Sequence, residues 1–338
     1  MIDCVFTVDY EIYGNGEGSL RELVYEPAER LRAVFKKWAA PWVVFVEAAE
    51  LEVIGSALAD PAIALVERQV REMRADGVEI GLHLHPQWYN AHLDGGSWVL
   101  DHDEYNLCRL SPDRIDAIIG RSISYLRRVL DDPDFTPLSF RAGNWLLQPT
   151  SPAARSLVKH GIKIDSSVFK GGLQRRQGLD YRRALKNGYH WTFTDDVNVP
   201  DPEGILLELP TYTRMVPPWE MLTPKRLGLR QKSSPGTKGK TGKLSRLADF
   251  ARIRQPMKLD FCRQTAKELT GMLRKEMERD RSDPSINRPI VAIGHTKDLI
   301  DIETLDTSLA FMRNFGIAIS TFSSEYEKAI ESRSHAAD

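Results

Sequence analysis

Short apolar runs of strand length alternate with amphipathic segments of helical length along almost the whole chain. Repeated strand–helix units in one chain imply a parallel sheet covered by helices, so the sequence predicts an α/β fold. In such sheets and barrels, chemistry gathers at the carboxyl ends of the strands. The expected strands are residues 2–8, 42–46, 78–84, 137–141, 163–166, 204–209, 289–294 and 316–321, and the expected helices are residues 26–37, 48–58, 62–75, 111–130, 151–160, 260–278 and 304–314.

The composition is that of an ordinary globular enzyme. At 338 residues, 42% of them hydrophobic, the chain has the length for one large barrel or two domains. Its three cysteines are odd in number and widely spaced, which favours a reducing compartment over a disulfide framework. The sequence holds no apolar run of ~18 residues that would span a bilayer, and an early first strand leaves no room for a cleavable leader. We therefore expect a cytoplasmic protein.

Two histidines one residue apart, His83 and His85, lie in the segment EIGLHLHP at residues 79–86. Apolar residues alternate with them, which is a strand pattern, and residues i and i+2 of a strand point to the same face. Both imidazoles therefore face the same way at a strand end, where a divalent metal would accept one nitrogen from each. Most histidine pairs at this spacing bind nothing, so the pair needs support from elsewhere in the chain.

That support comes from the other strand ends. The apolar run VFTV at residues 5–8 delivers two carboxylates at the same i, i+2 spacing. A single strand-end aspartate is often only a helix cap, but polar residues follow six of the expected strands. They are Asp9 and Glu11, His83 and His85, Arg141 with Asn144, Asp165 with two serines, Glu208, and His295 with Lys297 and Asp298.

This ordered set resembles the polysaccharide deacetylase superfamily, the NodB-homology or carbohydrate esterase family 4 proteins. The resemblance implies a distorted (β/α)7 barrel over residues 1–325, with a C-terminal tail at 326–338. It also implies metal-dependent removal of an acetyl group from an N-acetylated or O-acetylated sugar. The variant motifs DYE, HLHP and GHTK look closest to cytoplasmic members associated with surface-polysaccharide or glycan biosynthesis. The matching segments are FTVDYE (6–11), EIGLHLHP (79–86), FRAGNW (140–145), LP (209–210) and IGHTKD (293–298).

Two motifs depart from the family pattern. The usual histidine pair is HxxxH and the usual acidic pair is DD, whereas this chain has HxH and DxE. We expect Glu11, His83 and His85 to hold a divalent metal, with Zn²⁺ preferred, because two imidazoles and a carboxylate leave positions open for water and the substrate carbonyl. The longer reach of Glu11 would compensate for the tighter histidine pair. Gln87 or Trp88 is an alternative ligand.

The chemistry of amide or ester hydrolysis assigns roles to further residues. Asp9 would take the proton of the attacking water, as a general base. Arg141 would orient Asp9 and keep it ionised by charge pairing. The resemblance makes His295 the general acid that protonates the leaving amine or alkoxide, and Asp165 either orients His295 or caps its own strand. The expected substrate-binding residues are Asn144, Trp145, Asp165 and Trp88.

The net charge of −1 hides a basic segment at residues 213–258, which carries twelve Lys or Arg against two acidic residues. The segment is either a solvated, partly flexible insertion or a lip that attracts an anionic or lipid-linked glycan. Aromatic residues are nearly absent from its middle, which argues against nucleic acid as a partner. If it steers the substrate, neutralising Lys232, Lys238, Lys240 and Lys243 should raise KM at low salt.

Three functions stay open on these grounds. The first is a carbohydrate deacetylase, the second is a catalytically degenerate carbohydrate-binding barrel, and the third is an amidohydrolase acting on a small non-sugar amide. A Rossmann-type oxidoreductase is disfavoured because no GxGxxG follows the first strand.

Overall fold

The computed structural model of the protein describes residues 1–223, 225–226 and 252–337. Within these residues, seven parallel strands form one curved sheet in the order β11, β7, β6, β3, β2, β1, β14. The strands are β1 (Ile2–Tyr10), β2 (Val43–Glu47), β3 (Glu79–Leu84), β6 (Ser139–Ala142), β7 (Ile164–Asp165), β11 (Leu206–Glu208) and β14 (Arg288–His295). A further strand, β15 (Ala318–Ser320), pairs in parallel with the first half of β1, on the edge whose second half pairs with β2. At the margin of the sheet, β10 (Trp191–Phe193) runs antiparallel to β11.

Isolated β-bridges bring the two edges of this sheet together. Thr211, which follows β11, bridges to Val291 in β14, and Asp260 bridges to Ile293 in the same strand. The curved sheet therefore closes into an irregular barrel. The predicted fold class, α/β with a distorted (β/α)7 barrel, is confirmed.

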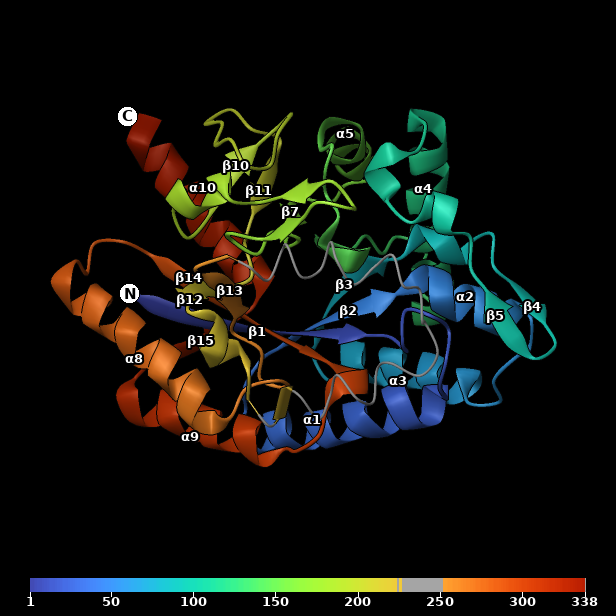
Figure 1. Cartoon of the computed structure of the whole chain (residues 1–338), viewed down its shortest axis with the longest axis horizontal. Coiled ribbons are helices and arrows are strands. Elements are labelled where there is room, and N and C mark those ends of the chain that lie inside the picture. The colour runs from blue at the N-terminus through green and yellow to red at the C-terminus, as the bar shows by residue number, and fades with distance from the viewer. Residues whose placement is uncertain (224, 227–251, 338) are drawn as a thin grey trace.

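Helices cover the outside of the barrel (Figure 1). The helices in the described residues are α1 (Glu26–Lys37), α2 (Ala48–Ser56), α3 (Ile63–Ala75), α4 (Pro112–Leu130), α5 (Ser151–Lys159), α8 (Ala266–Ser282), α9 (Glu303–Phe315) and α10 (Phe322–Ala337). None of them is both long and apolar enough to cross a bilayer. The helix expected at 260–278 begins only at Ala266, because Asp260 accepts bonds from the N–H groups of Cys262 and Arg263 and a Thr265–Glu268 capping box starts the helix.

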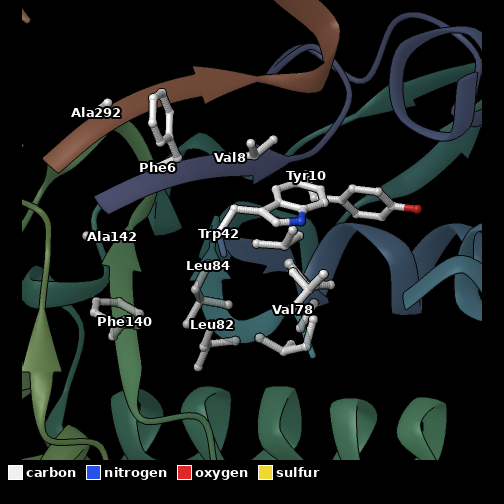
Figure 2. Packing of buried hydrophobic residues seen from close by; sticks show 14 of the residues in the cluster. Phe6, Val8, Tyr10, Trp42, Val78, Leu82, Leu84, Phe140, Ala142 and Ala292 are labelled. Atoms are coloured by element: carbon white, nitrogen blue, oxygen red, sulfur yellow. The ribbon is translucent and has the colours of Figure 1, made fainter. Parts of the chain in front are cut away.

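The strands have two different buried faces. In β1, Phe6, Val8 and Tyr10 belong to the large cluster shared with the helices, part of which Figure 2 shows. The alternate residues face the barrel interior, where Val5 belongs to a smaller cluster with residues of β2, β7, β11 and β14. Because side chains alternate along a strand, the residues that follow Val5 on this inner face include Asp9.

The C-terminal helix α10 lies at the opposite end of the barrel from the strand ends that carry the predicted site. Ser323 donates to the carboxylate of Glu79, the first residue of β3, and Lys328 pairs with Asp3 near the start of β1. Phe322 packs in the smaller cluster. The predicted boundary between the barrel and a C-terminal tail, at residues 325 and 326, falls inside α10.

The basic segment at 213–258 begins and ends in a short antiparallel ladder of β12 (Thr213–Val216) and β13 (Gln255–Lys258). The ladder is anchored to the barrel because Tyr212 donates to the carbonyl of Val291 in β14 and Ile293 donates to the carbonyl of Leu259. Lys232, Lys238, Lys240 and Lys243 lie outside the described residues. The remaining short strands are the hairpins β4 (His92–Asp94) with β5 (Ser97–Val99) and β8 (Leu173–Gln174) with β9 (Leu179–Asp180).

Candidate metal centre and active site

Glu11, His83 and His85 meet at the carboxyl end of the barrel, with all three side chains buried. Oε2 of Glu11 lies 3.1 Å from Nε2 of His85 and 3.6 Å from Nε2 of His83. One potential ligand atom from each of the three residues lies within 4.8 Å of the other two. The predicted set of three metal ligands is therefore brought together, and the longer Glu11 reaches both histidines.

The local fold fixes the two histidines in different ways. Nδ1 of His83 lies 2.8 Å from the carbonyl oxygen of Arg141 in the neighbouring strand β6, so this nitrogen carries a proton and Nε2 is the nitrogen that faces Glu11. The backbone N–H of His85 donates to Glu47 at the end of β2, at 2.6 Å. Gly143 lets the loop after β6 approach, because a Cβ at this position would lie 2.7 Å from Cγ of His85.

The donor set fits a divalent ion. Oε2 of Glu11 is buried and has no hydrogen-bond partner, although it faces two imidazole nitrogens. Ligands at ~2.0–2.1 Å from a tetrahedral zinc ion lie ~3.3 Å apart, close to the two O–N distances observed. A cation between these three atoms would satisfy the unpaired oxygen and use the chemistry of two imidazoles and a carboxylate.

A lysine holds the other oxygen of Glu11. Nζ of Lys297 lies 2.8 Å from Oε1 of Glu11 and 3.0 Å from the carbonyl oxygen of Ile12. Burial opposes ionisation of Glu11, but Lys297 and the two histidines outweigh it and lower its pKa well below the usual range. Glu11 is thus a carboxylate, the form that a metal requires.

Asp9 lies beside this group and is bound to the fully buried Arg141. Oδ1 of Asp9 accepts a 2.6 Å bond from Arg141, whose guanidinium also donates to Thr7 and to both the carbonyl and hydroxyl oxygens of Ser166. Burial opposes ionisation of Asp9, but Arg141, His83 and His295 together lower its pKa. The contact predicted between Arg141 and Asp9 is present. It occupies only Oδ1, so Oδ2 of Asp9 is not bound to the guanidinium.

His295 ends β14 directly beside Asp9 in β1. Its Nε2 lies 3.3 Å from Oδ2 of Asp9 and 4.0 Å from Oε1 of Glu11. Its Nδ1 faces Asp298 at 3.9 Å, and Asp298 is itself held by Arg263 at 2.5 Å. Burial lowers the pKa of His295, against the opposing effect of Asp9 and Asp298.

Two of the expected substrate-binding residues, Asn144 and Trp145, are more exposed than the buried ligand group of Glu11, His83 and His85. Asn144 and Trp145 follow β6 with φ values of 56° and 67°, and both are partly exposed. Nδ2 of Asn144 lies 3.3 Å from Nδ1 of His85. Nζ of Lys258, the last residue of β13, lies 3.9 Å from the centre of the Trp145 ring and 4.7 Å from that of Phe169. Burial and the charge of Arg263 lower the pKa of Lys258 to about 7.

The other two residues expected to bind substrate, Trp88 and Asp165, are not exposed at the site. Trp88 is fully buried and its ring packs edge-on against Trp98, so it offers no face to a sugar. Asp165 is also fully buried, and its oxygens accept bonds from the N–H and hydroxyl of Ser167 rather than from His295. Asp165 thus stabilises the turn after its own strand. The carboxylate that faces Nδ1 of His295 is that of Asp298, at 3.9 Å, which is beyond hydrogen-bond distance.

Sequence reasoning missed two buried glutamates behind the metal ligands. Glu47 accepts bonds from the N–H groups of His85 and Glu50, and Glu50 accepts from the N–H of Ile12 at 2.8 Å. Burial and Glu50 raise the pKa of Glu47 well above its usual range, and burial and Glu11 raise that of Glu50 to about 8. Glu47 directly follows the strand expected at residues 42–46, so the strand-end rule that gave the other residues also points to it.

No protein-family model and no curated protein sequence matches this chain. Several solved structures are similar to it. A Mycobacterium smegmatis protein assigned as a polysaccharide deacetylase aligns with 98% of this chain and 92% of its own, with a TM-score of 0.54 and 15% identity. A Pseudomonas aeruginosa PAO1 protein with the same assignment aligns with 96% of this chain and 89% of its own, with a TM-score of 0.50 and 13% identity. The chain has the polysaccharide deacetylase fold.

This deacetylase fold also carries other named activities. The PuuE allantoinase aligns with 96% of this chain and 88% of its own, with a TM-score of 0.50 and 12% identity. At such identities the likeness concerns the fold, and the argument for a function has to come from the residues at the strand ends. The deacetylase fold predicted from the motifs is confirmed, and its carboxyl edge is where the metal-ligand group lies.

Proposed function

We propose that this protein is a metal-dependent hydrolase that removes an acetyl group from an N-acetylated or O-acetylated sugar, in surface-polysaccharide or glycan biosynthesis. One observation carries the proposal. A three-residue metal-ligand group with an unpaired buried carboxylate oxygen lies beside an arginine-held aspartate and a histidine, all at the carboxyl end of a deacetylase-type barrel. The second-best candidate, hydrolysis of a small non-sugar amide, is supported by the allantoinase that shares the fold.

The residues divide the work of hydrolysis. A divalent ion, with Zn²⁺ preferred, held by Glu11, His83 and His85 would polarise the acyl carbonyl and lower the pKa of water. Because Arg141 occupies Oδ1 of Asp9, Oδ2 is the oxygen that takes the proton of the attacking water. His295 lies next to that oxygen, with Nε2 at 3.3 Å, so it would receive that proton from Asp9 and pass it to the departing nitrogen or oxygen as the general acid. The C–N or C–O bond breaks, and acetate and a free amine or hydroxyl are released.

The direct test is acetate release by the metal-loaded protein over a panel of acetylated sugars, nucleotide-sugars, lipid-linked sugars and small non-sugar amides. The proposal expects acetate and the deacetylated sugar in equal amounts. Turnover of only the non-sugar amides would favour the second candidate. A protein that binds stoichiometric metal but releases acetate from nothing in the panel would be a degenerate carbohydrate-binding barrel.

We further propose that the sugar carries an anionic group, and Lys258 supports this. Its Nζ lies over the rings of Trp145 and Phe169 and has no salt bridge among the described residues. An anionic group beside it would raise its pKa from about 7 and keep it charged. The nearby carboxylates of Asp9 and Asp298 are already held by Arg141 and Arg263. A bound divalent ion adds two further positive charges, so a carboxylate or phosphate on the substrate would balance the site.

Lys258→Met should raise KM for an acidic acetylated sugar by ~10-fold or more, because a hydrogen bond to a charged group contributes ~1.5–3 kcal/mol. The kcat value, and KM for the neutral counterpart of the same sugar, should change little. Lys170→Met is the matched control, since Lys170 also lies over an aromatic ring but donates to the carbonyls of Asn187 and Gly188. Equal KM increases for the acidic and neutral sugars would contradict the role proposed for Lys258.

A further inference from the structure

The side-chain amide of Gln87 is fully buried and contacts the imidazole of His85. Its nitrogen has a hydrogen-bond partner there and its oxygen has none. Nε2 of Gln87 lies 3.2 Å from Nδ1 of His85. Its Oε1 is buried and has no hydrogen-bond partner, which is costly for an amide oxygen. Gln87 lies in the turn at Pro86–Trp88 that follows β3, so the side chain has little freedom to move elsewhere.

The hydrogen bonds in the structure hold His85 in the tautomer that does not bind a metal through Nε2. Gln87 and Asn144 both direct amide N–H groups at Nδ1, which therefore acts as the acceptor. The ring proton is then on Nε2, where it faces Oε2 of Glu11 at 3.1 Å. A metal at Nε2 requires the opposite tautomer, with the proton on Nδ1 and an acceptor beside it.

A half-turn of the Gln87 amide supplies that acceptor without moving the backbone. The turn exchanges Oε1 and Nε2, which are nearly the same size, and places the unpaired oxygen opposite Nδ1 of His85. The proton moves from Nε2 to Nδ1, so the lone pair of Nε2 joins the unpaired Oε2 of Glu11 in facing the same point. After this change Oε1 of Gln87 accepts from Nδ1 of His85, and a cation between the three ligand atoms would pair Oε2 of Glu11.

His83 needs no such adjustment, because its Nδ1 already lies 2.8 Å from a main-chain carbonyl oxygen, which only accepts. Asn144 is the other amide at His85, but it is partly exposed, so its oxygen has access to water. The amide of Gln87 is fully buried and has no such access. The burial difference therefore points to Gln87 rather than Asn144 as the acceptor.

We propose that Gln87 is a positioning residue that accepts the Nδ1 proton of His85 and so sets the tautomer in which His85 binds the metal. The inference rests on the metal site of the proposed function and adds a residue that does not touch the metal. It goes beyond the direct ligation that the sequence left open for Gln87.

The test is the affinity of the purified full-length protein for Zn²⁺, measured by competition with a chromophoric chelator. Gln87→Met keeps the length of the side chain and removes the acceptor, and should weaken Zn²⁺ binding by ~10–100-fold. Gln87→Glu keeps an acceptor and should bind at least as tightly as the wild type. Asn144→Ala is the matched control, because it removes the other amide at Nδ1, and should leave the affinity nearly unchanged.

A wild-type affinity for Gln87→Met, or an equal loss in Asn144→Ala, would overturn the inference while leaving the metal site intact. A wild type that binds no Zn²⁺ would instead overturn the proposed function and the inference together. A second measurement does not depend on folding of the variants. In ¹⁵N-histidine spectra of the Zn²⁺-loaded wild type, Nδ1 of His85 should carry the proton, and a metal bound at Nδ1 would refute the assignment.

Discussion

His83→Ala and His85→Ala should each lower Zn²⁺ affinity and hydrolytic activity by more than ~100-fold, while the barrel stays folded. Loss of a residue that only supports a ligand already costs ~10–100-fold, and loss of a ligand costs more. The fold should survive because the core clusters, not the histidines, hold the strands together. Metal content of the purified proteins, competition with a chelator and circular dichroism measure the three quantities.

His160→Ala is the control for these two variants. His160 is a partly exposed histidine whose Nε2 lies 3.1 Å from Asp116, on the outside of the barrel. Its replacement should leave metal content and activity unchanged. Stoichiometric metal in both His83→Ala and His85→Ala would rule out the proposed ligand set.

The second large effect should separate the two acidic residues at the end of β1. Asp9→Asn should retain the metal but lower kcat by ~10²–10⁴-fold, the contribution usual for a general base. Glu11→Gln should weaken Zn²⁺ binding itself, because it removes the charge from the oxygen that faces both histidines. Parallel measurements of Zn²⁺ affinity and of kcat at saturating metal distinguish the roles.

Asp9→Asn also leaves the buried Arg141 without its carboxylate, so stability has to be followed by thermal unfolding. The asparagine oxygen can still accept from the guanidinium, which limits the damage. If Asp9→Asn loses the metal and Glu11→Gln retains it, the two assignments are to be exchanged.

Much of the site could be predicted because it depends on strand periodicity. An i, i+2 spacing at the end of a parallel strand fixes the face, and neighbouring parallel strands bring their ends to one edge. For this reason Asp9, Glu11, His83 and His85 lie together, and Arg141 and His295 join them from β6 and β14. Glu47, at the end of the second strand, lies at the same edge by the same rule.

The rest depends on contacts that the sequence pattern does not contain. The sequence pattern gives Lys258 only as one charge of a basic segment. The ladder of β12 and β13 that carries it to Trp145 pairs it with Thr213, which is far away in the sequence. Asp165 was expected near His295, but β7 is only two residues long and its carboxylate is satisfied by Ser167. Periodicity predicts which face of a strand a side chain occupies. It does not predict which neighbouring residue forms a hydrogen bond or an ion pair with that side chain.

The ion pairs around the ligands have a consequence for how the protein is made. Glu11 is held by Lys297 and Asp9 by Arg141 through direct contacts at 2.8 and 2.6 Å, so these buried acids are neutralised by the chain itself. Proteins whose metal supplies the folding free energy unfold when a chelator removes it. Because the chain itself balances these acids, the barrel should fold without the proposed ion, and loading with metal would follow folding rather than drive it.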